Sequence, residues 1–510
     1  MRFFPELLLL LTSLSLNYIP PNGLSSGRPY TLQKGYTAAG ADELIKIGDY
    51  SVRLEEFNSG IDFKYDDFQH SHGTCYAQVK KWDKSSANYK NYLIDRTGKA
   101  YPVVYSVEDL TDTTLAINLS NQQLDSLPSE IFEYPALQVL IASYNRIQKL
   151  PAEIGQLSNL NKLDIKGNQV SDLPAEISQL SNLNTLILRE NQLETLPPEI
   201  GHLRNLALID LFGNKLNALP PEIGQLENLT KLDLLGNKLS SLPVEIGQLR
   251  KLTELNLTSN DLIELPVELE QLQDLTTLSI SGNQFSAFPA VVTKLRNLIS
   301  LNLSNNGFSD IPPEIGALKS LTYLNLSFNN LQSLPIEIGA LQNLTWLYLF
   351  SNKLYNLPAE IGYLQNLTEL NISYNDFSKL PAVVTRLQNL KLLNLTFNHI
   401  RALPSEIGKL KNLTTLELFG NQLISLPPEI GQLENLIKLE LGANELSELP
   451  PEIGQLNSLA LLYLRKNNLN VLPVEISELK ALRFLNLKEN NFSEDYIQQL
   501  RQTIPWCLIK

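Results

Sequence analysis

Three side chains near the N-terminus have types and a spacing that suit metal binding or nucleophilic chemistry. His70, His72 and Cys75 form an H-x-H-x-x-C cluster. Imidazole and thiolate groups bind zinc, and a thiolate is also a nucleophile. The other two histidines, His202 and His399, lie far away in the sequence. Because no further ligand or base stands close by, we predict that the cluster is structural and holds no metal.

A second motif, GLSSG from Gly23 to Gly27, formally fits the G-x-S-x-G pattern of a nucleophilic serine. That serine works on a sharp turn between a strand and a helix, whereas Pro20 and Pro21 precede this motif and disfavour a strand there. The sequence contains neither G-x-x-x-x-G-K-[ST] nor G-x-G-x-x-G, the loops that bind nucleotide phosphates. We therefore predict that the protein is not an enzyme and uses no cofactor.

Aromatic side chains between residues 320 and 420 form the candidate binding site. Trp346, Tyr348 and Phe350 alternate with Leu347 and Leu349, and this alternation sends all three rings to one face of a strand. Exposed aromatic clusters mark binding surfaces. The predicted ligand-binding patch consists of Tyr323, Trp346, Tyr348, Phe350, Tyr374, Phe397 and Phe419. Tyr323 and Tyr374 are expected on the strands beside Trp346, while Phe397 and Phe328 could also turn inward.

The elements that position these rings come from an internal repeat. An asparagine recurs every 23 residues from Asn145 to Asn490, at sixteen positions, and a proline keeps the same period from Pro128 to Pro473. Self-similarity at a fixed period is the signature of a solenoid. One such unit cannot bury its apolar face alone, so stacked units must share a continuous core.

One unit, LTYLNLSFNNLQSLPIEIGALQN from Leu321, shows what each repeated residue is expected to do. Its LNLSFN stretch alternates apolar and polar residues, as a strand with one buried face does. The Asn329 amide can satisfy buried backbone groups of adjacent turns. Pro335 starts a short helical turn, Ile338 faces the core, and Gly339 ends the turn. The sequence thus predicts an α/β solenoid with a parallel sheet on one face.

The repeat resembles the 23-residue "typical" leucine-rich repeat, LxxLxLxxNxLxxLPxEIGxLxxL. It is most similar to large bacterial sets that carry the phrase EIGQL, which occurs here at Glu153, Glu222, Glu245, Glu429 and Glu452. The resemblance covers residues 110–510. It implies a curved horseshoe, with a parallel sheet on the concave face and short helical or 3-10 turns on the convex face. It also implies that partners bind on the concave face.

The ends of the array depart from the repeat in ways that suit caps. The first unit has Gln122 at the asparagine position, and after the last asparagine Ser493 can cap a helix. We therefore predict a solenoid of about 17 units over 110–490 and a C-terminal helical cap over 491–510.

The segment before the array is of a different kind. Residues 27–109 lack the 23-residue period and contain short strand-like stretches. The elements YDD, AQVKK, LIDRTGK and the closing Pro102 resemble one WG repeat, a β-rich bacterial module without catalytic chemistry to carry over. We predict a small β-rich module over 27–109.

Residues 1–26 have features of a secretory signal peptide. Arg2 gives a positive start, and an apolar run follows from Leu7 to Leu16. Glu6 and the lack of an A-x-A site argue against a leader, so export and a cytoplasmic location both stay open. The run is too short to span a bilayer, and we predict no membrane insertion after leader removal.

Charge and cysteine content narrow the class of partner. The chain has 54 acidic and 41 basic side chains, a net charge of −13, and only two cysteines. An acidic chain repels a phosphate backbone, so we predict no nucleic-acid partner. Two cysteines do not make a disulfide framework. A monomer is expected.

Two binding functions remain. The first is protein–protein recognition through the concave face. The alternative is binding of carbohydrate or cell-envelope glycan, as in an adhesin, since Trp and Tyr among Asn and Ser also suit sugar rings. Residues four places before each repeated asparagine, such as Asp164 and Asp210, are predicted to point outward on the same face, far from the rings.

Overall fold

The computed structural model describes residues 44–47, 50–53, 61–63, 76–83, 88–95 and 100–510. The chain divides into two compact units, Met1–Val104 and Tyr105–Lys510. The predicted leader, the GLSSG motif and the cluster of His70, His72 and Cys75 lie outside the described residues.

The described part of the first unit consists of antiparallel strands. β1 (Leu44–Ile47) pairs with β2 (Tyr50–Arg53). A separate sheet runs in the order β3 (Ile61–Phe63), β4 (Tyr76–Asp83), β5 (Asn88–Asp95) and β6 (Ala100–Val104). These strands agree with a β-rich module, whereas its resemblance to a WG repeat stays a prediction.

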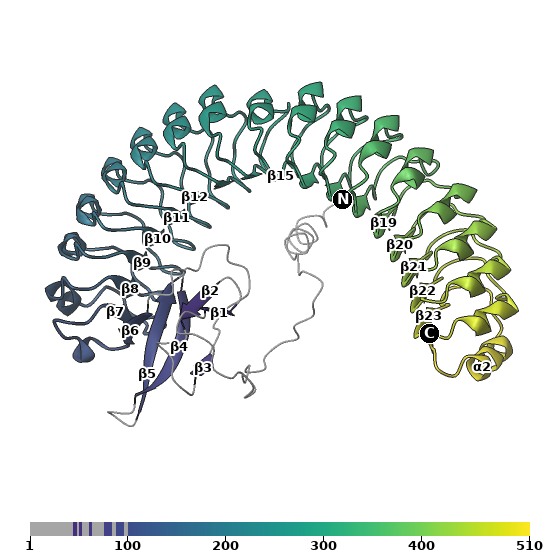
Figure 1. Cartoon of the computed structure of the whole chain (residues 1–510), viewed down its shortest axis with the longest axis horizontal. Helices are drawn as coiled ribbons and strands as arrows, with labels where there is room; N and C mark the ends of the chain where they lie inside the picture. Colours follow the sequence, from purple (N-terminus) through teal and green to yellow (C-terminus); the bar gives the residue numbers. More distant parts are fainter. Residues whose placement is uncertain (1–43, 48–49, 54–60, 64–75, 84–87, 96–99) are drawn as a thin grey trace. The chain divides into compact units, whose positions relative to one another are not determined.

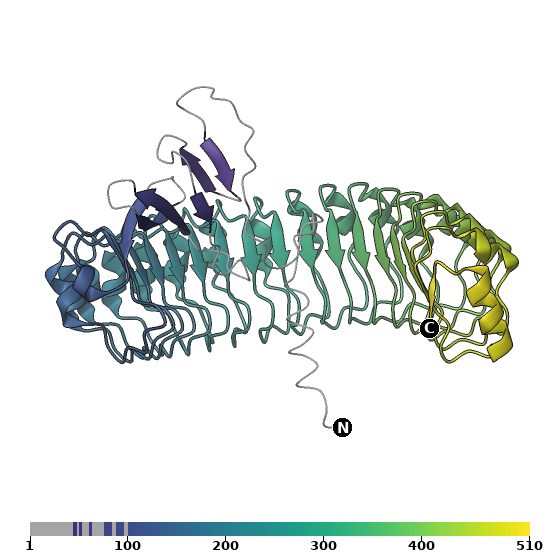
Figure 2. The same cartoon turned by 90° about the horizontal axis from the view of Figure 1, so that it is seen from below.

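The second unit is an open solenoid whose strands line the inner side of an arc (Figure 1). Figure 2 shows these strands side by side. The strands are β7 (Ala116–Asn118), β8 (Val139–Ile141), β9 (Lys162–Asp164), β10 (Thr185–Ile187), β11 (Leu208–Asp210), β12 (Lys231–Asp233), β13 (Glu254–Asn256), β14 (Thr277–Ser279), β15 (Ser300–Asn302), β16 (Tyr323–Asn325), β17 (Trp346–Tyr348), β18 (Glu369–Asn371), β19 (Leu392–Asn394), β20 (Thr415–Glu417), β21 (Lys438–Glu440), β22 (Leu461–Tyr463), β23 (Phe484–Asn486) and β24 (Leu508–Ile509).

Short 3-10 helices form the outer side of the arc. After η2 (Val107–Asp109) they are η3 (Ser129–Glu133), η4 (Ala152–Gln156), η5 (Ala175–Gln179), η6 (Pro198–His202), η7 (Pro221–Gln225), η8 (Val244–Gln248), η9 (Val267–Gln271), η10 (Ala290–Lys294), η11 (Pro313–Ala317), η12 (Ile336–Ala340), η13 (Ala359–Tyr363), η14 (Ala382–Arg386), η15 (Ser405–Lys409), η16 (Pro428–Gln432), η17 (Pro451–Gln455) and η18 (Val474–Glu478). The predicted horseshoe is therefore confirmed.

Strands β7 to β23 pair in parallel, with each residue opposite the one 23 places further along, and β24 pairs with β23 at an offset of 24, Phe484 lying opposite Leu508. The middle residues of β17 and β18, Leu347 and Leu370, lie opposite each other and are fully buried. Three-residue strands this short are stable because each is one rung of a long sheet over a continuous core.

The repeated asparagines form the buried ladder that the sequence predicts. Asn375 Nδ2 donates to the carbonyl oxygens of Leu349 at 3.0 Å and Ile372 at 3.2 Å. Its Oδ1 accepts from Leu354 N at 2.9 Å. One amide therefore satisfies backbone groups of two consecutive turns that water cannot reach.

The glycine of the EIG phrase has a different role from the predicted one. Gly339 lies within η12, one residue before its end, after the predicted Pro335 start. A Cβ on Gly339 would stand 2.5 Å from the carbonyl oxygen of Glu360 in the next unit. The glycine is needed because consecutive 3-10 helices approach closely on the convex side, not because a turn must end there.

The array ends in a helix, α2 (Glu494–Thr503), whose first turn is capped by Ser493. The Ser493 Oγ accepts from Tyr496 N at 3.2 Å, which satisfies one free donor of the helix start. Leu500 and Ile504 are buried. Burial raises the pKa of the Cys507 thiol to about 11, so this cysteine packs as an apolar residue.

Within the described part of the chain, no helix has the length and apolarity to span a membrane.

Candidate binding surface

From β12 onward, the first and third residues of most strands are partly exposed on the concave face, whereas β8 to β11 bury all three of their residues. In β17, Trp346 and Tyr348 are partly exposed and Leu347 between them is buried. Phe350 follows the strand and is also partly exposed. The pleat thus sends the three rings to the same side, as their alternation predicts.

The rings lie on five consecutive repeats, from that of Asn329 to that of Asn421. We call this set the aromatic surface, and it comprises Tyr323, Phe328, Trp346, Tyr348, Phe350, Tyr374, Phe397 and Phe419. Each of these side chains is partly or fully exposed. The structure therefore gathers all seven predicted residues, together with Phe328, on one stretch of the array.

Three of the rings sit in the strands themselves, beside an acidic residue. Tyr323, Trp346 and Glu369 are direct neighbours on β16, β17 and β18. The rings of Tyr323 and Tyr348 meet edge to face, with centroids 5.6 Å apart. Tyr348 Oη donates to Glu369 Oε2 at 2.7 Å. Burial raises the pKa of Tyr323. The hydrogen bond with Asn325 lowers this pKa, and the nearby Glu369 carboxylate raises it, so that the net shift is upward.

The other rings form a row just after the strands. Ring centroids are 4.8 Å apart between Phe328 and Phe350, 4.7 Å between Tyr374 and Phe397, and 5.3 Å between Phe397 and Phe419. The expectation that Tyr374 lies on the strand beside Trp346 is wrong, because β18 ends at Asn371 and Tyr374 lies in the turn that follows.

The Phe397 side chain points to solvent and does not turn inward, an orientation that the sequence had left open. It is 41% exposed, and Tyr374 is 53% exposed. Both adopt positive φ, 50° and 52°, a conformation that Gly reaches without strain. Gly420 occupies the equivalent place in the next repeat, and a Cβ there would stand 2.6 Å from Phe397 Cδ1. The missing side chain gives the Phe397 ring room to lie over the next unit.

The first part of the concave face differs from the sequence expectation. Asp164 is not exposed; it is 5% accessible, with Lys162 Nζ at 3.5 Å and a hydrogen bond from Ser143 Oγ at 2.8 Å. Asp210 is equally buried beside Arg189, whose Nη1 lies 3.8 Å from its Oδ2. Long basic side chains of the same face cover these carboxylates, and the residue spacing alone does not show this.

Asp210 is expected to make the stability of the protein depend on pH. Burial, and then the charge of Asp233, raise its pKa from 3.8 to about 6. The folded state then holds the proton more tightly than the unfolded chain. Asp210 therefore adds up to about 3 kcal/mol of stability as the pH falls from about 6 to about 4, and this contribution is lost as the pH rises through the same window.

Urea unfolding at about pH 4 and about pH 7.5 measures this effect. Asp210→Asn should remove the part of the pH dependence that Asp210 contributes and be more stable than the parent at the higher pH. Asp274→Asn, at an exposed carboxylate, is the matched control and should keep the parent's profile. An unchanged profile in Asp210→Asn would show that burial of this carboxyl is not what couples stability to pH.

Comparison with known proteins places the chain in a family. A model described as leucine-rich repeat matches residues 158–216, 204–262, 227–285, 365–423 and 434–492, and one described as leucine-rich repeat region matches 300–375. A solved leucine-rich-repeat protein of Leptospira interrogans is 42% identical over 80% of this chain and 99% of its own, with a TM-score of 0.72. This chain belongs to the leucine-rich-repeat family.

Two plant receptors of solved structure are also similar. The peptide hormone receptor RGFR1, solved in complex with RGF2, is 27% identical over 84% of this chain and 82% of its own, with a TM-score of 0.63. The leucine-rich-repeat ectodomain of the Arabidopsis thaliana receptor kinase GASSHO1/SCHENGEN3, solved in complex with CASPARIAN STRIP INTEGRITY FACTOR 2, is 30% identical over 78% of this chain and 55% of its own, with a TM-score of 0.53. No match was found among curated proteins.

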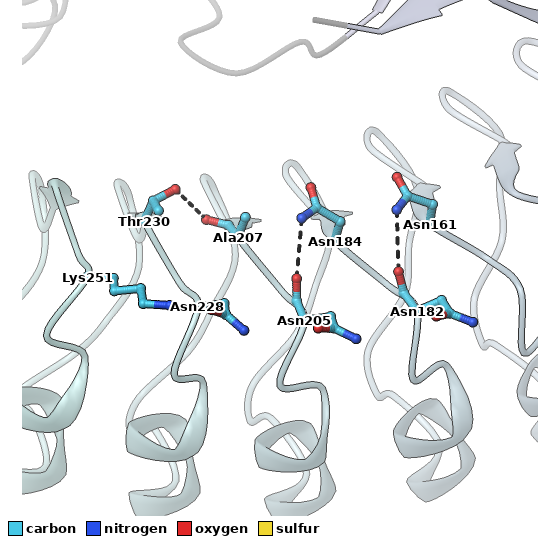
Figure 3. Close-up of a pocket in the computed structure, with 8 residues that line it drawn as sticks. All are labelled: Asn161, Asn182, Asn184, Asn205, Ala207, Asn228, Thr230 and Lys251. Atoms are coloured by element: carbon cyan, nitrogen blue, oxygen red, sulfur yellow. Dashed lines mark hydrogen bonds between the residues drawn. The ribbon is translucent and has the colours of Figure 1, made fainter. Parts of the chain in front are cut away.

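A groove beside the sheet is part of the leucine-rich-repeat scaffold (Figure 3). Its lining consists of Asn161, Asn182, Asn184, Asn205, Ala207, Asn228, Thr230 and Lys251. Asn161 Nδ2 donates to the carbonyl of Asn182 at 3.4 Å, and Asn184 Nδ2 to that of Asn205 at 3.3 Å. The amide donors thus satisfy carbonyl groups of the neighbouring unit. Among the residues that the structure describes, no group of three His, Cys, Asp or Glu could hold a metal.

Sequence reasoning missed Glu369 at this leucine-rich-repeat surface. It occupies the same strand position as Tyr323 and Trp346, so the 23-residue period could have shown it as their neighbour.

Proposed function

We propose that the protein is a non-catalytic scaffold that recognises a protein partner through the aromatic surface. The observation that carries this proposal is the gathering of eight partly or fully exposed rings on five consecutive repeats. Aromatic side chains bury a large area with little loss of rotamer freedom, and they dominate the energy of many protein interfaces. Contiguous exposed apolar patches are rare on surfaces without a partner.

Ring geometry favours a protein over a glycan. A sugar stacks on the open face of an aromatic ring, but the pairs Tyr323–Tyr348, Phe328–Phe350 and Phe397–Phe419 meet edge to face. In such a pair one ring covers a face of the other. Edges and exposed corners of this kind suit apolar protein side chains better. The two similar plant receptors were solved in complex with RGF2 and with CASPARIAN STRIP INTEGRITY FACTOR 2.

Site-specific photo-cross-linking tests the proposal. The photoreactive amino acid p-benzoylphenylalanine replaces Phe397 in one variant and Tyr144 in another, each in the full chain. Tyr144 is a close control because it holds the equivalent position in an early repeat and is 42% exposed, against 41% for Phe397.

We expect a discrete protein adduct at position 397, and none of the same mass at position 144, when expressing cells are irradiated. Excess parent protein should compete for this adduct. The same adduct at both positions, or no adduct at 397, would contradict recognition by the aromatic surface.

A further inference from the structure

We infer that the aromatic surface contains a socket for a cationic side chain, an arginine or lysine of the partner protein. The socket consists of Tyr323, Trp346, Tyr348 and Glu369 on the adjacent strands β16, β17 and β18. This inference rests on the proposed function and names the chemistry that the partner must offer.

The four side chains stand at neighbouring positions of the concave face. Tyr323, Trp346 and Glu369 form a line across three parallel strands, which are about 4.8 Å apart. Tyr348 projects from the same strand as Trp346, contacts the Tyr323 ring at 5.6 Å between centroids, and donates its hydroxyl to Glu369 at 2.7 Å. Trp346 therefore stands in register between the Tyr323 and Glu369 positions.

The charge of Glu369 lacks the nearby basic side chain that four other concave carboxylates have. Asp164, Asp210, Glu254 and Glu417 each have a Lys or Arg nitrogen within 4.0 Å. Among the described residues none lies within that distance of Glu369, which is partly exposed. Its bond from Tyr348 engages Oε2, which fixes the carboxylate while Oε1 can accept from a ligand.

Rings and a carboxylate together recognise a cation. A guanidinium or ammonium group over an aromatic face is attracted by the ring quadrupole, most strongly on Trp. The carboxylate adds a charge-assisted hydrogen bond, and partial burial weakens screening by salt. An arginine can stack its plane on Trp346 and donate to Glu369 at once. The net charge of −13 also draws basic partners toward the chain.

The inference is tested on the full chain with 5-fluorotryptophan in place of its three tryptophans. Trp346→Phe identifies the fluorine signal of Trp346. The probes are Nα-acetyl-arginine methylamide, its lysine counterpart, and the citrulline analogue as a neutral isostere of arginine. We expect saturable shifts of the Trp346 signal with the cationic probes, at least about fivefold weaker binding of citrulline, and no such response from Trp506.

Two matched variants complete the test. Glu369→Gln should weaken arginine binding by at least about fivefold, while Glu406→Gln, the same change at an exposed site on η15, should leave it unchanged. Equal binding of citrulline and arginine, or unchanged binding by Glu369→Gln, would overturn the socket. If either result is obtained but the adduct at position 397 still forms, the proposal of protein recognition holds and only the proposed binding of a cationic side chain is refuted.

Discussion

Leu370→Ala is expected to lower the free energy of unfolding by about 2–5 kcal/mol. Leu370 is the middle residue of β18 and is fully buried, with Leu347 and Leu393 as its neighbours on the adjoining strands. Removing its branched end leaves a cavity in mid-array that fixed neighbours on both sides cannot fill. Urea unfolding followed by circular dichroism measures the loss.

Asn375→Ala in the same repeat separates the polar ladder from the apolar core. It removes the amide that bonds the Leu349 and Ile372 carbonyls and the Leu354 amide, and should cost about 1–3 kcal/mol. Asn366→Ala is the control, because Asn366 also links two units, through Gln342 O at 2.9 Å, but is exposed to water. Equal stability of the Asn375→Ala variant and the parent would refute this account of the ladder.

The leucine-rich-repeat architecture follows from the sequence because its determinants recur at every unit. A single alternating stretch such as LNLSFN is a weak indication of a strand. Sixteen asparagines in one register leave no other way to bury the leucines. The same register placed Trp346, Tyr348 and Phe350 on one face, as the structure shows.

What the sequence could not show depends on contacts between side chains of different units. Asp164 occupies an outward position of its strand, yet Lys162 and Ser143 enclose it. Phe397 could turn either way, and the absent side chain of Gly420, one repeat further on, gives it room on the surface. Alternation determines the face to which a residue points, and the neighbours determine whether it reaches water.

Trp346→Ala combined with Tyr348→Ala is expected to weaken binding of the protein partner by about 2–4 kcal/mol. Both rings lie at the centre of the aromatic surface and of the cationic socket, with Tyr323 and Glu369 in direct contact with the pair. Because both rings are partly exposed, replacing them should change the free energy of unfolding only slightly. The loss of the Tyr323 contact and of the hydrogen bond to Glu369 should together cost about 1–2 kcal/mol of folding stability, less than the middle of the range expected for Leu370→Ala.

The control is a double alanine substitution on a strand outside the aromatic surface. Thr277→Ala with Ser279→Ala alters β14 at the two positions that correspond to Trp346 and Tyr348, and both residues are partly exposed. It replaces the buried Asp164, which is unsuitable as a control since its loss would remove a buried contact with Lys162 Nζ and so disturb the fold. This variant should bind and melt like the parent.

Calorimetric titration of the partner identified by the position-397 adduct, with parent, ring variant and β14 variant side by side, tests the central claim most directly. We expect the dissociation constant of the ring variant to rise by a factor of about 30 to about 1,000. Its melting temperature should stay close to that of the parent. Unchanged affinity of the ring variant, or a fall in its melting temperature as large as that of Leu370→Ala, would show that the aromatic surface is not where this protein binds its partner.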